Sequence, residues 1–157
     1  MNIAQEIIRI CSEKEKTIAS CESLTAGLFS STIASNPGAS QVLKGGLVTY
    51  FTEMKEKLAK VDPKIVLEYG VVSEACALAM AENTLRIMEV DYCVSFTGNA
   101  GPSVMEGKPA GCVYCAIATA QKSFTFHFQC DDMTRNEVRA YVVEQMLKHL
   151  YALVQKG

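Results

Sequence analysis

The sequence predicts an α/β protein, a three-layer α/β/α sandwich around a mixed sheet of about five strands. Segments with helical spacing alternate with short apolar and β-branched segments along the chain, a pattern typical of helices packed on a sheet. The last two strand-like segments are separated by only a few residues, which favours an antiparallel hairpin and hence a mixed sheet. The chain has 157 residues, 49% of them apolar, so we expect one domain over residues 1–157 with its own core.

The first half of the chain predicts helix, strand, helix and strand, followed by two short helices. Apolar residues at helical spacing indicate the first helix, and Pro37-Gly38 ends the second. We expect Gly45-Gly46 to precede the second strand, Thr52 to cap the helix that follows it, and Gly70 to end the last helix. The predicted elements are a helix over 2–15, a strand over 16–21, a helix over 25–34, a strand over 47–51, a helix over 52–58 and a helix over 62–70.

The second half predicts a long helix, three strands and a final amphipathic helix. Ser73 followed by Glu74 is a typical helix start. In the final helix Val138, Val142 and Leu150 fall on one apolar stripe. The predicted elements are a helix over 73–88, strands over 91–96, 111–118 and 123–129, and a helix over 134–155.

The charge pattern excludes several classes of partner. Charged residues make up 20% of the chain, the formal net charge is −2, and both signs are spread along the sequence. Nucleic-acid grooves and membrane-binding patches need clustered Lys and Arg, so we expect neither partner. The N-terminus lacks the basic start and apolar run of a signal peptide, and no apolar stretch is long enough to cross a bilayer. We therefore expect a cytoplasmic protein.

The seven cysteines predict small buried thiols in a reducing compartment rather than disulfides. Cys112 and Cys115 have CxxC spacing, but they fall in a predicted strand, where positions three apart point to opposite faces. No His/Cys/Asp cluster has metal-ligand spacing, so we expect no metal site. His127 and His149 show no pattern that supports a Ser/His/Asp triad.

Ser23 lies at a predicted strand-to-helix junction. A hydroxyl at a helix N-terminus meets free backbone N–H groups and the positive end of the helix dipole, which can hold an anion or the oxyanion formed from an amide. An ordinary helix cap is the more frequent role of serine at such a position, and this alternative stays open.

Three other features gain little support from residue types alone. The loop 97–102 follows a strand and contains two glycines, as ligand-binding loops of α/β sheets do, yet it is neither GxGxxG nor a P-loop. Lys55 stands among charged neighbours and looks like part of a solvated helix face. Arg135 and Arg139 begin the last helix, where the dipole disfavours cations, so a bound anion would be one reason for them.

Taken together, however, several segments resemble one family, that of the CinA C-terminal domain. They occur in order across nearly the whole chain. Residues 17–27 (TIASCESLTAG) resemble the family's TIATAESCTGG, 46–55 (GLVTYFTEMK) resemble GFVTYSNEAK, 70–73 (GVVS) resemble GAVS, 97–102 (TGNAGP) resemble TGIAGP, 108–111 (KPAG) resemble KPVG, and 135–139 (RNEVR) match RxxVR.

The resemblance implies an amidase, since stand-alone members of the family deamidate nicotinamide mononucleotide to nicotinic acid mononucleotide and ammonia without metal or organic cofactor. The implied chemistry uses Ser23 as nucleophile and Lys55 as base, with Tyr50 orienting Lys55 or relaying a proton. It also implies a homo-oligomer, for which a dimer is the commonest symmetric form. The residues expected to hold the nucleotide are Thr25, Gly27, Thr97, Gly98, Asn99, Ala100, Gly101 and Arg135.

The sequence departs from the family pattern at three places. Ala26 replaces the first glycine of the usual pair, and Asn99 replaces isoleucine. Ser103-Val104-Met105-Glu106-Gly107 stands where further glycines normally follow Gly-Pro. A methyl group or a stiffer loop narrows a pocket, so a second interpretation stays open: an altered or non-catalytic module that binds a nucleotide or a protein in the same cleft.

Overall fold

The computed structural model describes residues 1–157 as six α-helices, one 3-10 helix and five strands. Their order is α1 (Ile3–Glu13), β1 (Ile18–Glu22), α2 (Leu28–Ala34), η1 (Ala39–Gln41), β2 (Leu43–Val48), α3 (Thr52–Lys57), α4 (Pro63–Tyr69), α5 (Glu74–Met88), β3 (Tyr92–Gly98), β4 (Cys112–Ala118), β5 (Ser123–Gln129) and α6 (Arg135–Lys156).

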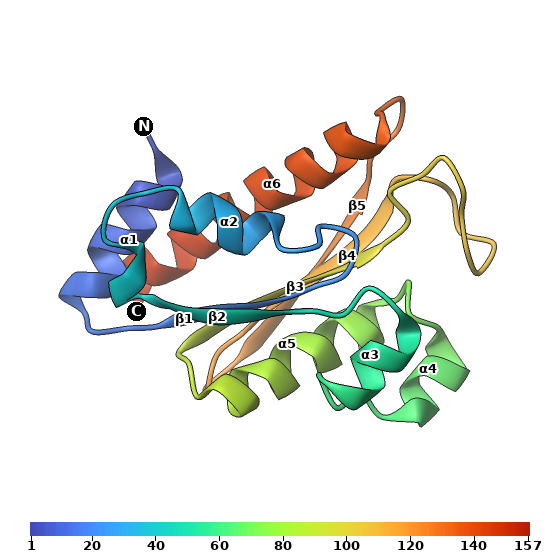
Figure 1. The fold of residues 1–157 in the computed structure, drawn as a ribbon, viewed down its shortest axis with the longest axis horizontal. Helices are drawn as coiled ribbons and strands as arrows, with labels where there is room; N and C mark the ends of the chain where they lie inside the picture. The colour runs from blue at the N-terminus through green and yellow to red at the C-terminus, as the bar shows by residue number, and fades with distance from the viewer.

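The strands form one mixed sheet in the order β2-β1-β3-β4-β5. β1 is parallel to both β2 and β3, while β3–β4 and β4–β5 are antiparallel. Helices α1, α2 and α6 cover one face, and α3, α4 and α5 lie on the other (Figure 1). The predicted three-layer sandwich with a mixed five-stranded sheet is confirmed, and so is the hairpin of the last two strands.

Strand β2 differs most from its prediction. It spans Leu43–Val48 rather than 47–51 and therefore contains both glycines that we expected to precede it. A Cβ at Gly46 would lie 2.7 Å from the Ser20 hydroxyl oxygen on the neighbouring strand and 2.8 Å from that of Ser30. A glycine in the strand thus allows a close approach between layers, and Tyr50 falls in the loop that follows.

The start of helix α2 is the second difference. The helix begins at Leu28, three residues after the predicted Thr25, and Ser23 is not its cap. Ala26 and Gly27 both have left-handed backbone conformations, with φ of 47° and 98°, which a helix cannot accommodate. Likewise Thr52 is the first residue of α3 rather than its cap, because the N-cap position belongs to Phe51.

The cysteines are all free and buried. Cys115 belongs to the large apolar cluster under α1, α2 and α6, whereas Cys112 belongs to the smaller cluster on the α5 side. The two thiols of the CxxC spacing therefore face opposite sides of the sheet, as strand geometry predicts.

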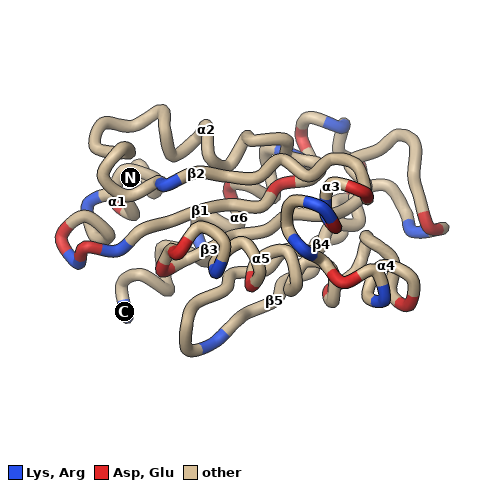
Figure 2. Tube along the Cα trace, turned by 60° about the horizontal axis from the view of Figure 1, so that its bottom comes forward, with Lys and Arg blue, Asp and Glu red and all other residues tan.

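Figure 2 shows Lys and Arg interspersed with Asp and Glu along the whole trace, with no continuous basic stripe. None of the helices combines the length and the apolar character that crossing a membrane requires.

Candidate active site

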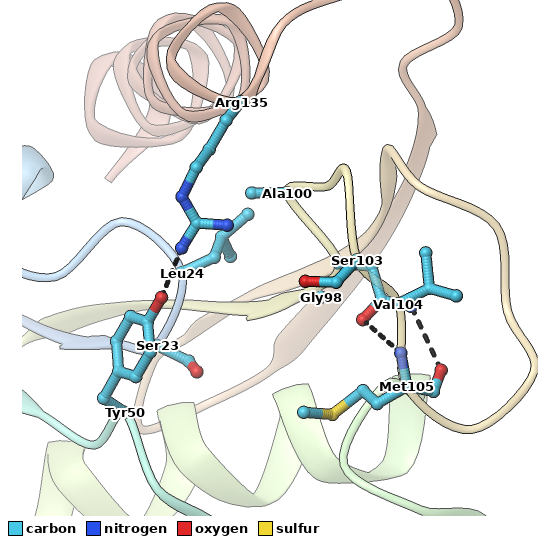
Figure 3. A pocket seen from close by; sticks show the side chains of 10 residues that line it. Ser23, Leu24, Tyr50, Gly98, Ala100, Ser103, Val104, Met105 and Arg135 are labelled. Atoms are coloured by element: carbon cyan, nitrogen blue, oxygen red, sulfur yellow. Dashed lines mark hydrogen bonds between the residues drawn. The ribbon is translucent and has the colours of Figure 1, made fainter.

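A pocket of about 250 Å³ opens at the carboxyl ends of the central strands. Glu22, the last residue of β1, pairs with Val48, the last residue of β2, and with Phe96 of β3, which continues to Gly98. β1 continues to α2 on one face and β2 to α3 on the other, which is the topology at which open α/β sheets bind ligands. The lining residues are Ser23, Leu24, Tyr50, Gly98, Asn99, Ala100, Ser103, Val104, Met105 and Arg135 (Figure 3).

Ser23 lines this pocket, and the buried Lys55, which is not part of the lining, contacts Ser23. The Ser23 amide donates to the Phe96 carbonyl, which fixes the serine directly after β1. The Lys55 Nζ, from α3, lies 3.0 Å from the Ser23 Oγ and 2.8 Å from the Thr49 carbonyl oxygen. A third contact, 3.3 Å long, joins it to the Tyr50 carbonyl oxygen. The structure thus brings together the two residues that the resemblance implied as nucleophile and base.

Lys55 is buried, with only 2% of its surface exposed, so the solvated position that its charged neighbours suggested is wrong. No carboxylate lies within ion-pair distance of its amine. Burial lowers the pKa of Lys55 from its ordinary value of 10.5, against smaller opposing effects of Cys76, Cys21 and Glu106. A neutral amine has two hydrogens and one lone pair. This matches two carbonyl acceptors and one hydroxyl donor, so the unprotonated lysine can accept the Ser23 proton.

Glu22 organises the turn that presents Ser23. Its carboxylate is 1% exposed and accepts hydrogen bonds from the backbone amides of Gly27, Phe29 and Ser30 and from the Ser20 hydroxyl. It therefore caps α2 from inside the protein, five to eight residues along the chain. Sequence reasoning left its role open; an acidic residue at the end of an otherwise apolar strand was the available signal.

Two backbone amides beside Ser23 have no partner. In the turn after β1, the amides of Ala26 and Leu28 bond to the carbonyls of Ser23 and Thr25, and that of Gly27 bonds to Glu22, but those of Leu24 and Thr25 are free. Arg139 of α6 holds the same turn: its guanidinium donates at 2.8 Å to the Leu24 carbonyl, which belongs to the same peptide group as the free Thr25 amide, and at 3.0 Å to the Thr25 carbonyl. Adjacent free amides next to a nucleophile can stabilise an oxyanion.

Arg135 lies above the pocket at the start of α6, where it donates to the Gly101 carbonyl and to the Tyr50 hydroxyl. Figure 3 shows the Tyr50 side chain reaching toward Arg135. Lys55 contacts the backbone carbonyl of Tyr50, so the contact expected between Lys55 and this tyrosine is made by its main chain.

The other residues expected to bind the nucleotide divide into two groups. Gly98, Asn99 and Ala100 line the pocket, but Thr97 and Gly101 do not. The Thr97 hydroxyl is buried and donates to the Val71 carbonyl, while Gly101 contributes the carbonyl that Arg135 binds.

Thr25 and Gly27 also lie outside the pocket lining. The Thr25 hydroxyl is buried without a hydrogen-bond partner, and the Gly27 amide is occupied by Glu22. The pocket residues that sequence reasoning missed are Leu24, Ser103, Val104 and Met105, which are apolar or small and carry no recognisable chemical signal.

The two histidines lie outside the pocket lining. His127 stacks on Tyr114, and His149 stacks on Phe126. No group of three or more His, Cys, Asp or Glu side chains is arranged to hold a metal ion.

Comparison with known proteins identifies relatives of the whole chain. The family model described as CinA C-terminal domain matches residues 1–154. A relative from Listeria monocytogenes serotype 4a (strain HCC23), named as a competence-damage inducible protein, is 40% identical over 148 residues, which are 92% of this chain and 35% of the relative. One from Geobacillus sp. (strain WCH70), with the same name, is 46% identical over 117 residues, covering 74% and 28% of the two chains. The chain thus spans about a third of the length of these curated relatives.

Solved structures share the fold. The competence/damage inducible protein CihA from Agrobacterium tumefaciens superposes with a TM-score of 0.93 at 29% identity, covering 96% of this chain and 93% of that one. A CinA superfamily protein from Klebsiella pneumoniae 700603 gives a TM-score of 0.94 at 22% identity, with 99% and 97% covered.

Proposed function

Because the chain belongs to the CinA C-terminal domain family, we propose that it is an amidohydrolase that converts nicotinamide mononucleotide and water to nicotinic acid mononucleotide and ammonia. The observation that carries the proposal is the 3.0 Å contact between the Lys55 amine and the Ser23 hydroxyl. Serine is a weak nucleophile until a neighbouring base takes its proton. A buried amine with a lowered pKa and no carboxylate partner supports that role.

In the first half of the reaction Ser23 attacks the carboxamide carbon. The neutral Lys55 amine takes the hydroxyl proton while the Oγ–C bond forms, and the carbonyl electron pair moves onto oxygen. The free amides of Leu24 and Thr25 stabilise this oxyanion. Lys55 then gives its proton to the amide nitrogen, the C–N bond breaks, and ammonia leaves an acyl-enzyme ester on Ser23.

In the second half the same lysine acts on water. Lys55 takes a proton from a water molecule, whose oxygen attacks the ester carbon. Collapse of the second oxyanion breaks the bond to the Ser23 Oγ, which recovers a proton from Lys55. The free acid leaves, and the pair returns to its starting state.

Arg135 is the cation suited to the phosphate of the nucleotide. Its fork of donors matches phosphate oxygens. Two of its nitrogens contact Gly101 and Tyr50, which leaves further N–H donors of the guanidinium for a ligand.

A second candidate function is supported by one observation. The segment 103–107 places side chains in the pocket lining where the family's pattern has glycines. A pocket narrowed in this way favours the alternative of an altered module that binds a nucleotide or a protein partner without hydrolysis.

The two functions are separated by measuring ammonia release from nicotinamide mononucleotide. We expect turnover by the wild type and loss of it in Ser23→Ala and Lys55→Ala. Lys57→Ala is the matched control, because Lys57 lies on the same helix with 67% of its side chain exposed and should leave the rate unchanged. Binding of the nucleotide by wild-type protein without ammonia release would reject the hydrolase in favour of the binding module.

A further inference from the structure

Two departures from the family pattern are joined in the structure. The Asn99 side chain, at the end of β3, donates to the carbonyls of Met105 and Lys108, each at 3.1 Å. Its Oδ1 accepts from the Met105 amide at 3.2 Å. Asn99 is 4% exposed, so these three bonds use a nearly buried amide. The asparagine that replaces isoleucine therefore braces the segment that replaces the glycines.

A second brace ties the same segment to the junction of α4 and α5. The Glu106 carboxylate accepts from the backbone amides of Val71 and Val72, at 2.7 and 2.9 Å. Gly70 makes room for it: its φ is +79°, and a Cβ there would lie 2.5 Å from a Glu106 oxygen. Lys108 adds a hydrogen bond to the Val72 carbonyl and lies 3.8 Å from the Glu106 carboxylate.

The braced segment forms the pocket wall across from Ser23 and Tyr50. In Figure 3 the Ser103 hydroxyl and the Met105 side chain extend toward the pocket, whereas the Val104 side chain points away from it. Met105 is 49% exposed although it lines a concave site. An exposed apolar side chain in such a place is available to a ligand.

We propose that Met105 determines specificity by packing its thioether against the ring that carries the substrate carboxamide, and that Asn99 and Glu106 are positioning residues that hold it there. A thioether is polarisable and makes favourable contacts with aromatic rings, often at the ring edge. Such a contact requires that the substrate carboxamide be carried by a flat aromatic ring. The proposal rests on the proposed amidase function for the identity of the ligand.

Binding measurements test the proposed role of Met105 independently of turnover. Two probes are titrated calorimetrically: nicotinic acid mononucleotide, which has the ring, and ribose 5-phosphate, which lacks it. We expect Met105→Ala to weaken binding of the first about 2- to 10-fold, the range of sulfur–aromatic contacts, and to leave the second unchanged. Met105→Leu separates the thioether from simple apolar contact and should recover part of the loss. Leu67→Ala is the control, because Leu67 is an exposed apolar residue of α4 outside the pocket lining, and it should change neither affinity.

The braces are tested by hydrogen exchange. Glu106→Ala should speed exchange of the Val71 and Val72 amides and weaken ring binding to the same extent as Met105→Ala. Glu106→Gln keeps one acceptor oxygen and should restore most of both. Equal affinities of the wild type and Met105→Ala for the ring-bearing probe would overturn the proposal even if the wild type releases ammonia. If the wild type releases no ammonia but Met105→Ala still weakens binding of the ring-bearing probe alone, the role of Met105 is supported and the hydrolase function is rejected.

Discussion

Two buried ionisable residues, Glu22 and Lys55, flank Ser23, and the groups that surround them have opposite character. Glu22, beneath α2, is surrounded by donors: three backbone amides and a hydroxyl point at its carboxylate. Lys55, at the side of α3, has two backbone carbonyls and the Ser23 hydroxyl but no anionic partner. Both are almost fully buried, at 1% and 2% exposure.

The difference indicates that Glu22 stabilises the fold, whereas Lys55 is suited to the proposed proton transfer. Dipoles aimed at a carboxylate stabilise its charged form and hold the chain in one conformation. An amine buried without an anion is less easily protonated, which favours the neutral form that can accept a proton. We therefore expect loss of Glu22 to act mainly on folding, and loss of Lys55 mainly on turnover.

The largest effect is expected for Lys55→Met. Removal of a general base should lower the rate of ammonia release about 10²- to 10⁴-fold. Because burial lowers the pKa of Lys55, the folded wild type binds fewer protons than the unfolded chain between that lowered pKa and 10.5, and its stability rises with pH there. Urea unfolding should show the variant relatively more stable at neutral pH than at pH 10. If Lys55→Met releases ammonia at the wild-type rate, Lys55 is not the general base and the contrast with Glu22 fails.

Glu22→Ala should have the next largest effect, on stability. It leaves one buried and two partly buried backbone amides without their acceptor. An unsatisfied buried donor costs about 1 to 3 kcal/mol, so we expect a total loss of about 3 kcal/mol. Glu22→Gln retains one acceptor oxygen and should lose less. Denaturant unfolding measures both. A wild-type midpoint for Glu22→Ala would contradict a structural role.

Arg139 extends the comparison to a third ionisable residue, which contacts the turn after Ser23 but neither Ser23 nor Lys55. Arg139→Met frees the Leu24 and Thr25 carbonyls, and we expect kcat to fall about 10- to 100-fold, less than deletion of an oxyanion donor, with KM little changed. Lys148→Met is the control on the same helix, because the Lys148 side chain is half exposed and pairs with Glu144 on the helix surface. A rise in KM at constant kcat would assign Arg139 to substrate binding instead.

The smallest effect concerns pH. kcat/KM should rise with pH as Lys55 loses its proton, with a midpoint below 10.5 because burial lowers its pKa. The Glu106 carboxylate opposes that shift, so Glu106→Gln removes a negative charge that favours the ammonium form. The midpoint should therefore move to lower pH, as pH–rate profiles of the two proteins will show. A shift to higher pH would contradict this assignment.

The sequence predicted best those elements whose signals are local. Ser73 caps α5, and Thr134 forms a capping box with Glu137 at the start of α6, so both helices begin within a residue of their predicted positions. The bounds of β2 were predicted wrongly because Gly45-Gly46 looked like a break before a strand. In the structure Gly46 lies within the strand, where the close hydroxyls of Ser20 and Ser30 leave no room for a Cβ, and these residues are neighbours only in the folded chain.

The site was less accessible to residue-level reasoning. Ser23 and Lys55 were paired by a family resemblance, since a lysine among Glu and Lys neighbours gives no sign of burial. Asn99 was expected to contact the nucleotide, yet its side chain binds the segment 105–108. Spacing cannot reveal such contacts, because they depend on how a loop folds back.

The clamp on the turn after Ser23 comes from a helix far along the chain, α6. Arg139 follows the carbonyls that it holds by 115 and 114 positions. During translation the serine and its lysine therefore leave the ribosome well before that arginine does. Under the proposed mechanism, a nascent chain that lacks α6 carries Ser23 and Lys55 with oxyanion donors that are not yet held in place, so reactivity toward amides requires the synthesis and packing of that helix.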